Sequence, residues 1–200
     1  MQVLQRFHLT CDEDQDLFSS VPEAPVRPEL AAMLQWYVPM APAISTEKAR
    51  SEWIVAPLLA ELFLMTDGQV SLFSGTEFSP DAASGLAGAV DFLISRSRER
   101  YFTQVPGVAV MEAKNEDTRR GLGQCAAIMV AAQRFNERGE QQSGVVFGGV
   151  TTGSNWRFLQ LDGAHVAVDR REYHFNQLGL ILGILQHMVS TGGPGRDPAA

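Results

Sequence analysis

Three charged side chains stand where the sequence otherwise predicts buried strands, and their types could do chemistry together. Asp91 lies within the apolar run 88–94, and Glu112 and Lys114 end the apolar run 106–114. Successive side chains of a strand point to opposite faces, so Glu112 and Lys114 share a face. Burying a charge is costly unless the charge is paired or bound to a metal. The pattern therefore predicts a polar site that two neighbouring strands build.

Two carboxylates on neighbouring strands can hold one divalent cation. Mg²⁺ is usually bound through one or two carboxylates together with waters and phosphate oxygens, and Asp91 and Glu112 would supply such ligands. A cation in that place polarises a phosphate and makes a water a better nucleophile near neutral pH. Lys114 would position that water or offset the charge that develops on the phosphate. The residues therefore favour metal-assisted attack of water on a phosphate.

The segment after Lys114 predicts a helix over residues 121–136 with one apolar face. Helix N-termini favour anions, and Gln124 stands in the first turn of this helix. Gly121 and Gly123 would let the backbone come close either to a phosphate or to the neighbouring strand. Both interpretations of the two glycines stay open.

The elements around these residues indicate an α/β protein with a mixed central sheet flanked by helices. A first helix begins after Thr46, and Pro57 should kink or split it. A polar loop is expected over 75–85. The remaining predicted elements are, in order, strands at 69–73, around Asp91 and around Glu112, the helix at 121–136, strands at 145–151, 156–161 and, as an edge strand, 166–169, and a final helix capped by Asn176.

Glu52 is a further acidic residue with a possible role. It shares a helical stripe with Ala56, Leu59 and Phe63, so the stripe is otherwise apolar. A carboxylate that faces the core needs a cation or a hydrogen-bond partner, whereas one at the edge of the stripe reaches water. Both alternatives stay open.

Composition divides the chain into three segments. Residues 45–190 hold the elements above and are expected to form one domain. Residues 1–44 carry six acidic residues against two arginines, and we interpret them as an N-terminal appendage that packs on the core or on a partner. A short helix at 29–37, ended by the prolines that follow, is expected there. Residues 191–200 are expected to be a flexible tail.

The charge and the cysteines exclude several classes of protein. A formal net charge of −7 in 200 residues argues against a uniformly basic protein that coats nucleic acid. Cys11 and Cys125 have no CxxC spacing, so a disulfide framework or a structural zinc site is not expected. The apolar runs are short for a membrane span. We therefore expect a cytoplasmic protein without membrane contact. Arginines near the site are expected to contact substrate phosphates: Arg96, Arg98, Arg119 and Arg120.

Asp91, the triplet Glu112-Ala113-Lys114 and Gln124 together resemble the motif of the PD-(D/E)XK nuclease superfamily. The pattern Gly-x-x-Asp-Phe, with Glu-Ala-Lys followed by Gly-x-Gln, is similar to the nuclease domain at the N-terminus of type I restriction motor subunits and to related stand-alone bacterial proteins. The resemblance covers residues 45–190 and includes the element order. Val90 stands where the motif has proline. The resemblance implies a restriction-endonuclease-like αβββαβ core.

The function that this resemblance implies is a Mg²⁺-dependent endonuclease, a hydrolase that cleaves DNA in restriction, defence or DNA processing, with Mn²⁺ able to substitute. The implied catalytic set is Asp91, Glu112, Lys114, Gln124 and Glu52, and the implied metal ligands are Asp91, Glu112 and the Ala113 carbonyl. Several alternatives stay open. The substrate could be RNA, and a second copy of the chain or a protein partner could supply specificity. The protein could also be a non-catalytic nuclease-fold module that binds nucleic acid or a protein within a larger assembly.

Overall fold

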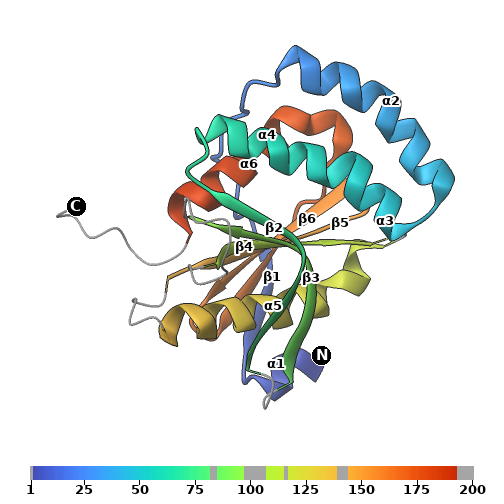
Figure 1. Ribbon diagram of the computed structural model, residues 1–200. Coiled ribbons are helices and arrows are strands. Elements are labelled where there is room, and N and C mark those ends of the chain that lie inside the picture. Colours follow the sequence, from blue (N-terminus) through green and yellow to red (C-terminus); the bar gives the residue numbers. More distant parts are fainter. Residues whose placement is uncertain (1, 82–84, 97–106, 115–116, 139–143, 193–200) are drawn as a thin grey trace.

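The computed structural model describes residues 2–81, 85–96, 107–114, 117–138 and 144–192. In this part of the chain, one open, mixed sheet of eight strands carries helices on both faces (Figure 1). The predicted α/β class is therefore confirmed. The strands run in the order β1-β7-β6-β5-β4-β3-β2, with β8 paired to β6. Their bounds are β1 (Thr10–Gln15), β2 (Ser71–Asp81), β3 (Leu86–Ser95), β4 (Gly107–Ala113), β5 (Val146–Thr151), β6 (Asn155–Asp162), β7 (His165–Asp169) and β8 (Tyr173–His174).

Helices connect and cover these strands. Their bounds are α1 (Gln2–Arg6), α2 (Pro28–Ile44), α3 (Glu47–Arg50), the π-helix η1 (Ser51–Val55), α4 (Ala56–Met65), α5 (Thr118–Arg138), the 3₁₀ helix η3 (Phe175–Gln177) and α6 (Leu178–Thr191). The β4–β5 and β1–β7 pairs are parallel and the other strand pairs are antiparallel. Parallel neighbours need a crossover connection, and α5 provides it between β4 and β5.

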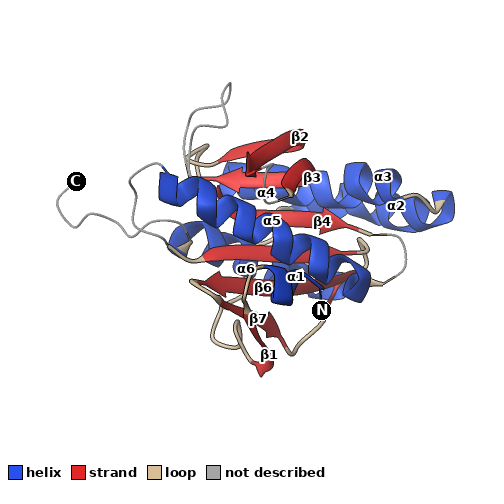
Figure 2. Ribbon diagram, turned by 90° about the horizontal axis from the view of Figure 1, so that it is seen from below, coloured by secondary structure: helices blue, strands red, loops and turns tan. Residues whose placement is uncertain are grey.

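The two faces of the sheet build separate cores. Helices α2, α4 and α6 cover one face, and α5 covers the other (Figures 1 and 2). Successive side chains of β4 point to opposite faces and contribute to both cores. Met111 packs under α4 and α6, and Val110 packs under α5. Glu112 therefore continues the α5 side of β4.

Pro57 interrupts the first helix of the predicted domain, as expected. Thr46 caps α3 by accepting a hydrogen bond from the Ala49 amide at 3.0 Å. The helix then widens into η1, where the Ala56 amide donates to the carbonyl of Ser51, and α4 follows. Proline has no amide hydrogen and collides with the preceding turn, so a widened turn before it relieves both problems.

The segment 1–44 is built into the sheet and its cover. Strand β1 pairs with β7, so β7 is not the edge strand that was expected at 166–169. Helix α2 does not end at residue 37 but continues through Pro39 and Pro42. Each proline removes one helical hydrogen bond, but buried side chains on α2, such as Leu34 and Ala41, hold it against the core.

The polar loop expected at 75–85 is largely a β-hairpin. Strand β2 continues to Asp81 and pairs with β3 along most of its length. Phe78 explains the difference, because its ring lies 5.6 Å from that of Phe135 on α5. An aromatic contact of this kind anchors the hairpin to the helix. The apolar residue was too isolated among polar neighbours to predict a strand.

The C-terminal helix begins differently from the prediction. His174, not Asn176, precedes the first turn, and its amide donates to Oε1 of Gln177 at 2.9 Å. Of the predicted tail 191–200, Thr191 ends α6 and residues 193–200 lie outside the described residues. No helix in the described part of the chain has the length and apolar character needed to cross a membrane.

Candidate active site

Asp91 and Glu112 come together because β3 and β4 pair in antiparallel register. The register places Leu93 opposite Val110, and continuing it by two residues places Asp91 opposite Glu112. Leu93 and Val110 both pack in the core beneath α5. Side chains two residues apart share a face, so Asp91 and Glu112 both lie on the α5 side of the sheet.

Short contacts hold the two carboxylates and the lysine in one group. Oδ2 of Asp91 accepts a hydrogen bond from the Ala113 amide at 2.8 Å. The ammonium group of Lys114 lies 3.2 Å from Oε2 of Glu112. The Lys114 amide donates to the carbonyl of Thr151 at 2.7 Å, which extends the β4–β5 ladder past Ala113. The structure thus brings Asp91, Glu112 and Lys114 together at the end of β4.

Glu112 has an unusual electrostatic environment. Its side chain is 0% exposed, and Oε1 has no hydrogen-bond partner among the described residues. Burial raises the pKa of Glu112 from its ordinary value of 4.5 to about 7; the charge of Asp91 adds to the rise, while Lys114 and the backbone amide of Asp91 oppose it. A buried carboxyl that ionises near neutral pH, with one unpartnered oxygen, has the properties of a ligand or an acid–base group.

Helix α5 lies over the pair with its first two turns. It begins at Thr118, three residues before the predicted start, and Oδ1 of Asp117 accepts the Arg119 amide at 2.9 Å. Cys125 is fully buried, and burial together with the charge of Glu112 raises the pKa of its thiol. Sγ of Cys125 lies 3.8 Å from the carbonyl of Gly149, and the next residue, Val150, pairs with Glu112, so the second turn of α5 lies near Glu112.

Gln124 lies in the second turn of α5, not in the first, because the helix begins earlier than predicted. Its exposed side chain lines a groove of about 180 Å³ between α5 and the β2–β3 hairpin. Val90, the neighbour of Asp91 in β3, lines the same groove. The described residues that line this groove do not include Asp91, Glu112 or Lys114, so the structure does not place the Gln124 amide at the carboxylates.

The structure does not bring Glu52 to this group. Its side chain is 54% exposed and forms an ion pair of 2.7 Å with Lys48. It also lines a groove of about 500 Å³ between α2 and α4, together with Tyr37 and Pro57. The change from α-helix to π-helix at Ser51 rotates the residues that follow, so the simple helical stripe does not describe where Glu52 points.

The four arginines that were predicted to contact phosphates lie in different parts of the chain. Arg96 does not line the site, because Nε donates to the carbonyl of Val189 at 3.0 Å and Nη2 to that of Gly192 at 2.6 Å. It thereby ties β3 to the end of α6. Arg98 lies outside the described residues. Arg119 and Arg120 are exposed in the first turn of α5.

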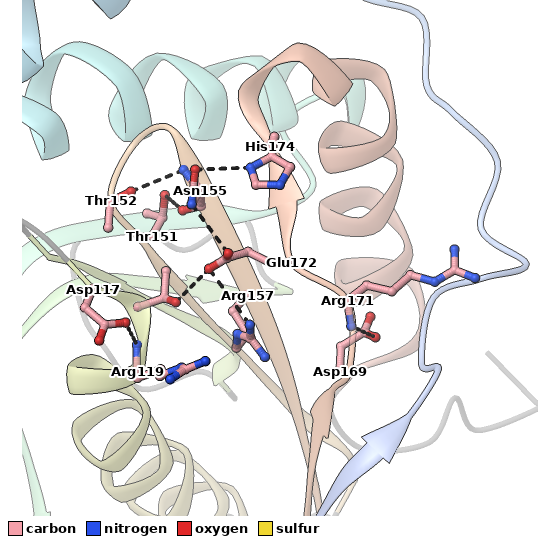
Figure 3. A network of polar contacts seen from close by, with 11 residues as sticks. Asp117, Arg119, Thr151, Thr152, Asn155, Arg157, Asp169, Arg171, Glu172 and His174 are labelled. Carbon is pink, nitrogen blue, oxygen red and sulfur yellow. Dashed lines mark hydrogen bonds and ion pairs between the residues drawn. The ribbon is translucent and has the colours of Figure 1, made fainter.

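A second polar group, which the sequence did not reveal, ties α5 to β6 (Figure 3). Glu172 accepts hydrogen bonds from Oγ1 of Thr118 at 2.9 Å and from Nδ2 of Asn155 at 3.4 Å. A guanidinium nitrogen of Arg157 lies 3.9 Å from Glu172. Thr118 and Glu172 are 54 residues apart, so no local spacing signals the contact. The group fixes the first turn of α5.

The donor set of the site fits a hard cation. Asp91 and Glu112 offer carboxylate oxygens, and Oε1 of Glu112 is a buried acceptor without a partner. In the described part of the chain, no group of three or more His, Cys, Asp or Glu side chains could hold a metal. Mg²⁺ commonly uses only one or two carboxylates and completes its shell with waters and phosphate oxygens.

Comparison with known proteins adds no relative. The chain matches no protein-family model, and a search of curated proteins finds no match. The fold and the site together define an α/β protein with two carboxylates and a lysine at the end of a central strand. Function has to be argued from that site, because the same fold class serves many functions.

Proposed function

We propose that this protein is a Mg²⁺-dependent endonuclease that hydrolyses phosphodiester bonds in DNA. The observation that carries the proposal is Glu112, a fully buried carboxylate with one unpartnered oxygen beside a second carboxylate and a lysine. The charge of Asp91 opposes ionisation of Glu112, so it does not favour a purely structural Glu112–Lys114 ion pair. A bound cation would give both carboxylates a counter-charge.

The proposed metal ligands are Asp91, Glu112 and the Ala113 carbonyl, and the fit is one of donor chemistry. A bound Mg²⁺ would polarise the phosphate and lower the pKa of a bound water. Mn²⁺ suits the same oxygen donors and should substitute. Ca²⁺ prefers a larger and looser shell, so we expect it to support cleavage poorly.

Lys114 and Gln124 have proposed roles on either side of the reacting phosphate. Lys114 would donate to the phosphate or to the attacking water, where it offsets developing charge. Only 15% of its side chain is exposed, and little water competes with such a contact. Gln124 would orient the substrate from the groove beside Val90. Arg119 and Arg120 would contact neighbouring phosphates and so position the strand.

The element order supports the superfamily assignment as part of this proposal. The run α3–α4, β2, β3, β4, α5, β5 has the order of a restriction-endonuclease-like αβββαβ core. Asp91 lies on the second strand of that run, and Glu112 and Lys114 lie at the end of the third. On this basis we propose membership of the PD-(D/E)XK superfamily and a role in restriction, defence or DNA processing.

The test is cleavage by the purified protein of linear and circular DNA, both single- and double-stranded, with RNA as a parallel substrate. We expect DNA cleavage with Mg²⁺ or Mn²⁺, and loss of cleavage in a parallel preparation of Asp91→Asn. Preference for RNA would reassign the substrate. A pure wild-type protein that cleaves none of these substrates with either metal would reject the nuclease.

A non-catalytic module that binds a protein partner is the second candidate, and one observation favours it. Helix α2 exposes Trp36 (79%), Met40 (36%) and Ile44 (49%), which are spaced at i, i+4 and i+8 and so share one face. Exposed apolar residues that gather on one face are typical of an interaction surface. Co-purification of a stoichiometric partner that Trp36→Ala releases, without any cleavage, would support this candidate over the enzyme.

A further inference from the structure

Gly121 of α5 lies against the side chain of Lys114. A Cβ atom at Gly121 would lie 3.1 Å from Cγ and 3.3 Å from Cε of Lys114, and 2.4 Å from Cγ1 of Val150. Carbon atoms in good contact are about 3.5–4.0 Å apart. No side chain therefore fits at Gly121 unless Lys114 and Val150 both move.

Because Gly121 has no side chain, its backbone packs against Lys114 and is the third contact that holds this lysine. Its amide is fixed to Thr151 at 2.7 Å, and its ammonium lies 3.2 Å from Glu112. Between these two ends, the aliphatic stem runs along the backbone of Gly121 from Cγ to Cε. A lysine stem is flexible and loses much rotamer entropy when it is fixed, so packing is needed to hold its charge in one place.

Gly123 shows that this contact is particular to one glycine. It lies on the same helix two residues further on, and a Cβ atom there would meet no atom within 4 Å. Of the two possibilities that the sequence left open, Gly121 approaches the strand and its lysine, while Gly123 faces open space.

We infer that Gly121 is a positioning residue for Lys114, because its bare backbone lets α5 press the lysine stem into the rotamer that places the ammonium on Glu112. For its catalytic meaning the inference rests on the proposed function. A misplacement of about 1 Å at a reacting group can reduce a rate by about 10²-fold. Gly121 would thus affect turnover without touching the substrate.

The first measurement reports the lysine itself and needs no activity. The sequence contains two lysines, Lys48 and Lys114, so ¹³C-labelled lysine gives two resolvable sets of side-chain NMR signals. Lys48 is 81% exposed and serves as the internal reference. Gly121→Ala should move the Cγ to Cε signals of Lys114 and leave those of Lys48 in place. Gly123→Ala, with the same gain in helix propensity, should move neither set.

Gly121→Ala also meets Val150 and could fail to fold for that reason alone. The double variant Gly121→Ala/Val150→Ala removes Cγ1 of Val150 and leaves the contact with Lys114, and Val150→Ala is its reference. The Lys114 signals of the double variant should still differ from those of Val150→Ala. Unmoved Lys114 signals in the folded double variant would overturn the inference.

The second measurement is a kinetic cycle with the lysine removed. Relative to Val150→Ala, we expect the double variant to lose at least about tenfold in kcat with KM changed less than about twofold. In a Lys114→Ala/Val150→Ala background, the same Gly121→Ala change should alter kcat by less than about twofold. An equal loss of kcat with and without Lys114 would show that Gly121 acts through another group.

If the wild type cleaves no nucleic acid, the proposed function fails. The NMR comparison alone then decides whether Gly121 sets the position of Lys114.

Discussion

The ammonium group of Lys114 lies 3.2 Å from Oε2 of Glu112, although only Ala113 separates the two residues in a strand. Strand alternation puts both side chains on the α5 side, and α5 then covers them. The lysine satisfies one oxygen of a carboxylate whose other oxygen has no partner among the described residues. Asp91 adds a second negative charge from the next strand. The cation that we propose would balance this charge.

Asp91→Asn should reduce cleavage by at least about 10²-fold, because it removes one negative ligand charge from the proposed metal site. The fold should be retained, since the amide oxygen of asparagine can still accept the Ala113 hydrogen bond. The measurement is single-turnover cleavage of labelled DNA, with circular dichroism and the unfolding temperature as the control. Undiminished cleavage by this variant would point to a contaminating nuclease.

Lys114→Ala should reduce kcat by about 10²–10³-fold, the range found when one donor to a developing charge is removed. Mg²⁺ affinity and KM should change little, because the lysine is not a proposed metal ligand. Lys48→Ala is the matched control, since Lys48 is exposed and pairs only with Glu52 among the described ionised groups. A change confined to KM would assign Lys114 to substrate binding instead of the transition state.

Much of the fold could be predicted from local pattern, because strands and helices that face one core have a clear period. The alternation around Glu112 and the interruption at Pro57 are local, and the structure has both. The proximity of Asp91 and Glu112 was predictable for a similar reason, since two strands that follow each other in sequence usually pair. Helix α2 was mispredicted because burial of Leu34 and Ala41 outweighs two prolines.

Other features depend on contacts that no local pattern contains. The strand around Phe78 exists because its ring meets Phe135, 57 positions later in the chain. Arg96 looked like a phosphate ligand by charge alone, but the end of α6 provides carbonyl acceptors for it. Glu172 carried no signal because its partners come from α5 and β6. These contacts are set by tertiary packing.

Stability without metal should depend on pH through Glu112. Folding raises the pKa of Glu112 from 4.5 to about 7, so the native state binds the extra proton between these values. The contribution of Glu112 is therefore most favourable below about pH 4.5, and it is lost as pH rises through about 7. From pH 5 to pH 8 the loss should be roughly 2–3 kcal/mol.

Glu112→Gln isolates this effect, because a neutral amide of similar shape has no proton to lose. Urea unfolding at several pH values gives the free energy of unfolding of both proteins. The difference, variant minus wild type, should rise by that amount between pH 5 and pH 8. Mg²⁺ at about 100 times its Kd should then stabilise the wild type at pH 8 by about 2.7 kcal/mol and leave the variant unchanged. A stability difference that is constant with pH would contradict the assigned environment of Glu112.

Arg96 should differ from Arg119 and Arg120 in what its removal affects. Arg96→Ala removes two charged hydrogen bonds to the end of α6 and should lower the free energy of unfolding by about 2–3 kcal/mol. The double variant Arg119→Ala/Arg120→Ala changes exposed side chains and should alter stability by less than about 0.5 kcal/mol. It should instead reduce the slope of log K against log salt for duplex DNA by about 0.9 per lost phosphate contact.

DNA binding is measured by fluorescence anisotropy in the Asp91→Asn background. Arg170→Ala is the charge control, because Arg170 pairs with Asp16 beside β1. If Arg96→Ala reduced the salt slope and Arg119→Ala/Arg120→Ala did not, the DNA would have to approach from the end of α6 instead of the first turn of α5.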